Sequence, residues 1–132
     1  MCQSGAREVQ KKVLAKNGSD KLRVFVVWTP RYPGDNRDKA VAATSLISDN
    51  RATHFWDGGG RLGRQYGKII NLPKNRTFAW DVYFVLNAQA KWEKTPPAPT
   101  EWMHQLGEDS RTLDGDRLRQ ATGRLLEQIN QR

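Results

Sequence analysis

The 132-residue chain contains a single cysteine, Cys2, and two histidines, His54 and His104. One cysteine excludes an intramolecular disulfide and a zinc site built from four cysteines. The histidines and the aspartates near them have spacings that match no metal motif, so we expect hydrogen-bonded structural histidines, with no metal and no cofactor. No apolar run approaches the roughly 18 residues that a membrane-spanning helix needs, and no signal peptide is recognised. These absences predict no membrane contact and a default location in the cytoplasm.

Acidic residues are also scarce, at 14 Asp and Glu against 22 Lys and Arg, which gives a formal charge of +8. Such a surface attracts phosphates, nucleic acid or acidic partners. Nucleic-acid binding is nevertheless not favoured, because the basic residues alternate with acids and no exposed aromatic ladder accompanies them. Hydrophobic residues make up 37% of the chain and include five Trp. This composition predicts one domain, residues 1–132, with a small core rich in aromatic side chains.

Hydrophobic spacing predicts alternating helices and strands. Helices are expected over residues 5–16 with Ser4 as N-cap, from 35 or 36 to about 47, over 62–70, and from 114 or 116 to the end of the apolar repeat near 129. Strands are expected over residues 22–28, 53–57 and 77–86, and a turn at 87–89 should fold the last of them onto 90–92 as a hairpin. This order predicts an α/β layered structure with a mixed sheet and a terminal helix.

The order of elements resembles the thioredoxin-like fold, particularly its peroxiredoxin-like members. The resemblance rests on Cys2-Gln3-Ser4-Gly5 before the first helix, on the strand at 23–28, on His54 to Asp57 with Leu62 and Tyr66, on the hairpin at 77–92, and on the last helix. It implies a three-layer arrangement that is incomplete at the N-terminus, because the strand before the redox helix would precede Met1. The sheet must then close over this absence, borrow a strand, or present a gap that another chain covers.

Two departures from the thioredoxin pattern bear on activity. Thioredoxins carry Cys-x-x-Cys at the helix start, whereas Gly5 stands three residues after Cys2; alternatively, Cys2 is the second cysteine of a motif whose first half is gone. The family also has a cis-proline just before its hairpin, where this chain has Phe78-Ala79-Trp80. The resemblance therefore implies a fold whose disulfide-exchange machinery is incomplete.

Cys2 is the candidate catalytic residue. A helix N-terminus stabilises a thiolate, and Arg7 or Lys11 lies one to two turns further along the predicted helix. Cys2 could then attack a peroxide or form a mixed disulfide. The plain alternative is a frayed terminal residue with ordinary thiol chemistry.

A candidate ligand site is predicted around two aspartates that each follow a tryptophan, Asp57 and Asp81. Asp81 interrupts an apolar predicted strand, so its carboxylate must find a cation, N–H groups or a proton. We expect it to be at least half buried near Trp28 or Thr29, with Arg31 or Arg76 as a structural partner. The predicted ligand-binding residues are Trp28, Thr29, Arg31, Asp57, Trp80, Asp81 and Tyr83. The Gly-rich run at 58–64 lacks the endings of known phosphate loops and is interpreted as a flexible turn.

The sequence favours a redox-inactive thioredoxin-like binding or assembly module with an unidentified ligand. We expect a homodimer, because a missing strand leaves backbone groups and apolar faces to be satisfied by another chain. Trp92 and Trp102 are the predicted interface residues. Two alternatives stay open: a single-cysteine peroxidase or thiol transferase that uses Cys2, and a basic nucleic-acid-binding domain.

Overall fold

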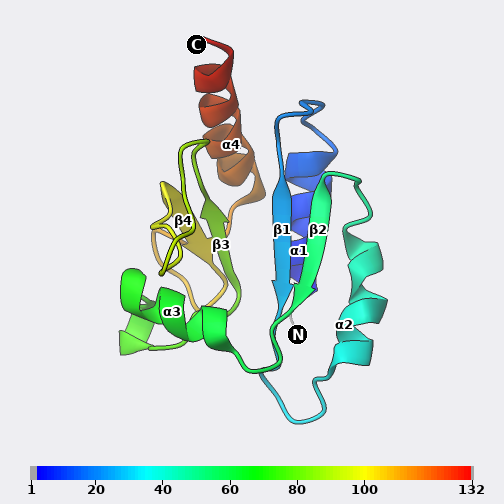
Figure 1. Cartoon of the computed structure of the whole chain (residues 1–132), viewed down its shortest axis with the longest axis vertical. Coiled ribbons are helices and arrows are strands. Elements are labelled where there is room, and N and C mark those ends of the chain that lie inside the picture. Colours follow the sequence, from blue (N-terminus) through cyan, green and yellow to red (C-terminus); the bar gives the residue numbers. More distant parts are fainter. Residues whose placement is uncertain (1–2, 132) are drawn as a thin grey trace.

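The structure is a computed structural model that describes residues 3–131 and has a mixed α/β fold (Figure 1). Its helices are α1 (Ser4–Glu8), α2 (Arg37–Ala43), α3 (Arg61–Ile69) and α4 (Gly115–Asn130), and its strands are β1 (Val24–Trp28), β2 (Ala52–Trp56), β3 (Val82–Val85) and β4 (Glu101–His104). Three short helical segments, η1 (Val9–Leu14), η2 (Thr44–Leu46) and η3 (Pro73–Asn75), complete the described elements. Within residues 3–131 no helix is both long enough and apolar enough to cross a membrane.

The strands form two separate pairs, so the prediction of one mixed sheet is wrong. β1 and β2 are parallel, in register from Val24 with Ala52 to Trp28 with Trp56, and β3 and β4 are antiparallel. No ladder joins β1 to β3 in the described chain, although Figure 1 draws them as the neighbouring strands of the two pairs. Different hydrophobic clusters hold the pairs: Trp28 belongs to one, and Val85 and Met103 to another. The pairs are therefore joined by side-chain packing, with Val9 contacting both clusters.

The first helix forms as predicted but begins and winds differently. α1 continues directly into η1, a π-helical segment in which the Ala15 N–H donates to the Gln10 carbonyl at 2.9 Å. Its N-cap residue is Gln3, without a side-chain capping bond, so the expected Ser4 cap is wrong. Ser4 lies inside the first turn, and its hydroxyl accepts a hydrogen bond from the Gln105 amide at 3.2 Å.

The predicted strand at 77–86 is shorter and has a different partner. Asp81 has a φ of 50°, a left-handed conformation that ends the pleat, so β3 begins at Val82. The expected hairpin with residues 90–92 is wrong, because β3 pairs with β4 across the proline-rich connector. Burial explains this choice: Trp102, Met103 and His104 of β4 are 8%, 0% and 0% exposed.

Glycines on α3 let the segment before β3 pack directly on that helix. A Cβ added at Gly63 would lie 2.7 Å from the Ala79 carbonyl oxygen, and one at Gly67 would overlap the Thr77 carbonyl. The Ala79 N–H donates to the Gly63 carbonyl at 2.9 Å. This close approach holds residues 77–80 beside α3 instead of in a sheet.

Of the two caps predicted as alternatives for each helix, Asn36 and not Asp35 starts α2, and Asp114 and not Asp116 starts α4. The Asn36 side chain accepts from the Lys39 N–H at 2.9 Å and starts α2. The Asp114 carboxylate accepts from the N–H groups of Asp116 and Arg117, both at 3.0 Å, and starts α4. These bonds satisfy amide groups that have no partner within the helix.

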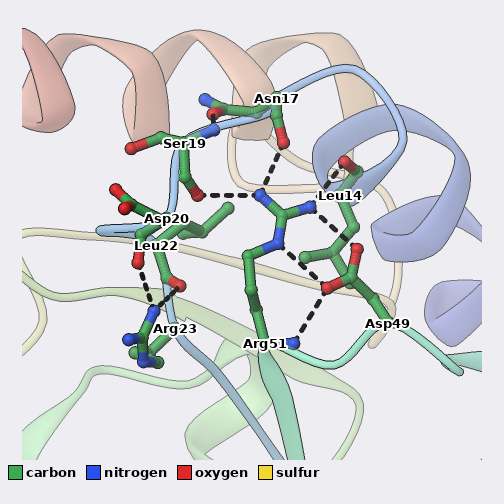
Figure 2. Close-up of polar contacts among 8 residues, drawn as sticks. All are labelled: Leu14, Asn17, Ser19, Asp20, Leu22, Arg23, Asp49 and Arg51. Carbon is green, nitrogen blue, oxygen red and sulfur yellow. Dashed lines mark hydrogen bonds and ion pairs between the residues drawn. The ribbon is translucent and has the colours of Figure 1, made fainter.

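Arg51, at the entrance to β2, ties that strand to the end of the first helix (Figure 2). Its guanidinium donates to the carbonyls of Leu14 at 2.9 Å, Asn17 at 2.6 Å and Ser19 at 3.0 Å. The Asp49 carboxylate binds the same guanidinium at 2.8 Å. One side chain therefore satisfies three carbonyls of the helix end and its loop, a role that sequence analysis did not assign.

Candidate functional site

Of the seven predicted ligand residues, five gather where β1 and β2 end: Trp28, Thr29, Arg31, Asp57 and Trp80. Because the two strands are parallel, their carboxyl ends lie at the same edge of the pair, the edge at which open α/β sheets commonly bind ligands. The Asp57 N–H donates to the Trp28 carbonyl at 2.8 Å, and the Thr29 hydroxyl donates to the Asp57 carbonyl at 3.2 Å. These bonds fasten the loops that follow the strands to each other.

Trp28, which is buried, and the partly exposed His54 form a hydrogen-bonded pair below this edge. The Trp28 indole N–H donates to His54 Nδ1 at 3.1 Å, and the two rings stack at 11°. Since Nδ1 accepts, Nε2 carries the proton and donates to the Ile47 carbonyl at 2.9 Å. Trp28 is 6% exposed, so its side chain packs beneath the loops and offers little surface to a ligand.

Asp57 holds the start of α3. Its carboxylate accepts from the N–H groups of Arg61 at 3.1 Å and Leu62 at 2.9 Å. The residue just before the helix, Gly60, has a φ of 65°, which glycine adopts without strain. The predicted site residue Asp57 thus satisfies the first two amides of α3, while Gly60 is the N-cap residue.

Arg31 and Trp80 are in contact, as their joint assignment to one site requires. The Arg31 guanidinium lies 4.9 Å from the Trp80 ring centre, and Tyr32 approaches the same ring edge-on at 6.1 Å. The Asp35 carboxylate accepts from the N–H groups of Arg31 at 2.9 Å and Tyr32 at 3.0 Å. These bonds lower the pKa of Asp35 from 3.8 to about 2, so the loop is held by an ionised carboxylate at neutral pH.

A cavity of about 260 Å³ opens beside this cluster. It is lined by Pro30, Arg31, residues 58–60, Arg64 and Phe78. Sequence analysis assigned Arg31 to the site but missed Arg64 and Phe78. The glycine-rich run at 58–64 was the available signal, because it places bare backbone next to a basic residue.

Asp81 and Tyr83 do not line this cavity. Asp81 is more than half buried, as predicted, and its carbonyl accepts from the Gln105 N–H at 2.9 Å. The Tyr83 hydroxyl donates to the Gln105 side-chain oxygen at 2.6 Å. Tyr83 also lies against Gly5, where an added Cβ would overlap the Tyr83 hydroxyl. Both residues are therefore bonded to Gln105, whose side chain contacts Ser4 at the start of the first helix.

The remaining predicted residues differ in exposure or fall outside the description. Cys2 lies outside the described residues. Trp102 is 8% exposed and packs in a cluster beneath Arg111, whose guanidinium lies 4.5 Å from the indole centre. Trp92 is 57% exposed and meets Tyr66 edge-on. Of the two predicted interface residues, Trp92 alone presents a large surface.

A second polar cluster, which sequence analysis also missed, surrounds the fully buried His104. The Leu106 N–H donates to Nδ1 at 3.0 Å, so the proton is on Nε2, which donates to the Asp109 carboxylate at 2.9 Å. The Arg111 N–H also donates to Asp109 and, together with His104, holds the pKa of that carboxyl below its ordinary value. Asp109 and Arg111 border a second, larger cavity of about 370 Å³. The arrangement matches the expected role of His104 as a hydrogen-bonded structural histidine.

Metal chemistry finds no support in residues 3–131, where no three His, Cys, Asp or Glu side chains come together. No protein-family model, curated protein or solved structure matches the chain. The functional proposal therefore rests on the geometry of the described residues.

Proposed function

We propose that this chain is a redox-inactive, thioredoxin-like binding and assembly module that works as a homodimer. The observation that carries the proposal is the division of the strands into two pairs with no ladder between β1 and β3. Each of these strands has one partner among the described residues, and the backbone groups on its other edge make no bond to the neighbouring pair. The edges of β1 and β3 face each other in Figure 1, whereas the outer edges of β2 and β4 also lack a ladder within residues 3–131 and are the ones that another chain can pair with.

The face of the β1–β2 pair supports the same proposal. Alternation along β1 directs Val24, Val26 and Trp28 into the core and leaves Phe25 on the opposite face, where it is 65% exposed. Phe55 of β2 is 49% exposed, and its ring centre lies 6.2 Å from that of Phe25. An exposed aromatic pair beside an open strand edge is typical of an association surface, and the same surface on two copies can form a closed two-fold interface.

The space around Gly5 favours a redox-inactive module. If Cys2 began a Cys-x-x-Cys motif, the second sulfur would stand at position 5. Tyr83 and Gln105 occupy the space of any side chain there: an added Cβ would overlap the Tyr83 hydroxyl and lie 2.7 Å from the Gln105 side-chain oxygen. A dithiol formed by these two positions would require Tyr83 to move.

Light scattering over a dilution series tests the homodimer. We expect twice the 15.1 kDa chain mass at micromolar concentration, with an interface on the order of 1,200 Å² or more. Phe25→Glu should yield a folded monomer, because it places a charge in the apolar contact. Val41→Glu is the matched control, since Val41 is 58% exposed but lies on α2, and it should leave the dimer intact. A wild-type monomer would overturn the proposal.

A further inference from the structure

We infer that the cavity at the carboxyl ends of β1 and β2 binds the phosphate group of a small ligand between the guanidinium groups of Arg31 and Arg64. This inference goes beyond assembly and does not depend on dimer formation. The cavity is defined by the loop after β1, the glycine run after β2 and the first turn of α3.

The charged side chains that line the cavity are all positive. Its walls contain two arginines and no acidic side chain. Among the described residues neither guanidinium forms an ion pair: that of Arg31 rests on the Trp80 ring, and that of Arg64 has no bonded partner. Arginines that face one cavity without a carboxylate leave their N–H groups available to an oxyanion.

Two carboxylates in the loops that form the cavity are engaged by backbone groups. Asp35 binds the amides of the loop after β1, and Asp57 binds the first amides of α3. Neither aspartate lines the cavity. Because Asp57 occupies those amides, the attraction for an anion comes from the two guanidinium groups and not from the helix N-terminus.

Gly60 allows the two sides of the cavity to approach. A Cβ added there would lie 2.8 Å from the Phe78 ring and 3.5 Å from Nη1 of Arg64. The Phe78 ring and the Arg64 guanidinium therefore both lie close to the bare backbone of Gly60, and the ring provides an apolar wall.

Size and charge select the ligand class. The volume of about 260 Å³ lies just below the range of roughly 300–1,000 Å³ typical of small-molecule pockets, so it suits a small ligand or one end of a larger one. Two guanidinium groups match a dianion better than a monoanion, because each can donate a pair of N–H bonds. A phosphate monoester meets both conditions better than a carboxylate.

Titration with inorganic phosphate, followed by amide NMR at low ionic strength, tests the inference, with acetate as the carboxylate probe. We expect saturable phosphate-induced shifts at residues 58–60 and at least tenfold weaker binding of acetate. Arg31→Gln with Arg64→Gln should weaken phosphate binding at least tenfold. Arg37→Gln with Arg119→Gln is the matched control, because it removes the same charge from exposed positions on α2 and α4, outside the cavity, and should change binding less than twofold.

The spectra of both double variants report whether each is folded. If the Arg31 and Arg64 variant fails to fold, Arg64→Lys keeps the charge, removes the planar fork and should still weaken binding severalfold. Equal weakening in the matched control, or the absence of shifts at residues 58–60, would overturn the site. Acetate binding as tight as phosphate binding would overturn the ligand class. Light scattering of the same samples reports their molecular mass, so a loss of phosphate binding can be distinguished from a loss of dimerisation.

Discussion

Arg51 binds both carboxylate oxygens of Asp49, with Nε 2.9 Å from Oδ1 and Nη2 2.8 Å from Oδ2. The carboxylate orients the guanidinium, and the remaining N–H groups reach carbonyls that lie more than thirty residues earlier in the chain (Figure 2). Both side chains are largely covered, at 14% and 18% exposed. The pair therefore connects the first helix to the β1–β2 pair at the end opposite the cavity.

Arg51→Lys should lower the free energy of unfolding by about 1–3 kcal/mol, because an ammonium cannot reach three carbonyls and a carboxylate together. Urea denaturation measures the change. Arg23→Lys is the matched control: Arg23 is exposed and, within residues 3–131, its guanidinium bonds to the nearby carbonyls of Asp20 and Leu22 alone, so we expect a change within about 0.5 kcal/mol. Equal losses in the two variants would contradict the specific role of Arg51.

Acid should destabilise the fold through Asp49 and Asp35. The guanidinium and N–H of Arg51 lower the pKa of Asp49 from 3.8 to about 2, and loop amides lower that of Asp35 to about 2. A carboxyl whose pKa is lowered by folding contributes stability above its unfolded pKa and loses it as the pH falls toward the folded value. Melting temperatures should therefore fall between pH 4 and pH 2, and less steeply in Asp49→Asn. An unchanged slope in that variant would exclude Asp49 as a contributor.

Gly5→Ala should destabilise the protein by about 1–3 kcal/mol, because the new methyl group overlaps the Tyr83 hydroxyl. In the Tyr83→Ala background the same substitution should cost less, which a double-mutant cycle would show. Gly123→Ala provides the contrast, since nothing lies within 4 Å of its added Cβ in α4. It should stabilise the protein by about 0.5–1 kcal/mol. Destabilisation by Gly123→Ala would contradict the open space that surrounds Gly123.

Cys2→Ser should change the free energy of unfolding by less than about 1 kcal/mol, because Cys2 precedes the apolar stripe of the first helix. Peroxide consumption in the presence of an added thiol should be negligible and the same with and without Cys2. Turnover that disappears in Cys2→Ser would instead support the single-cysteine enzyme. A loss of several kcal/mol would show that this residue packs in the folded protein.

The sequence by itself determined the elements whose signals are local. Val24–Trp28 is rich in β-branched and aromatic residues, and Asn36 and Asp114 precede helical repeats, so one strand and two helix starts could be predicted. The assignment of Arg31 and Trp80 to one site was also possible, because Arg31 follows the predicted strand at 22–28 and Trp80 directly precedes the candidate site residue Asp81. Their contact is observed at 4.9 Å.

Only the tertiary structure decided which strands pair and what completes the site. Residues 90–92 and β4 both follow β3, and burial of Trp102, Met103 and His104 selects β4. The same packing holds Phe78 against the glycines of α3 and brings it beside Arg64, a juxtaposition of distant residues that no local pattern encodes. Helix caps depend on neighbours three residues apart, whereas pairing and cavities depend on the apolar surface that the whole chain can bury at once.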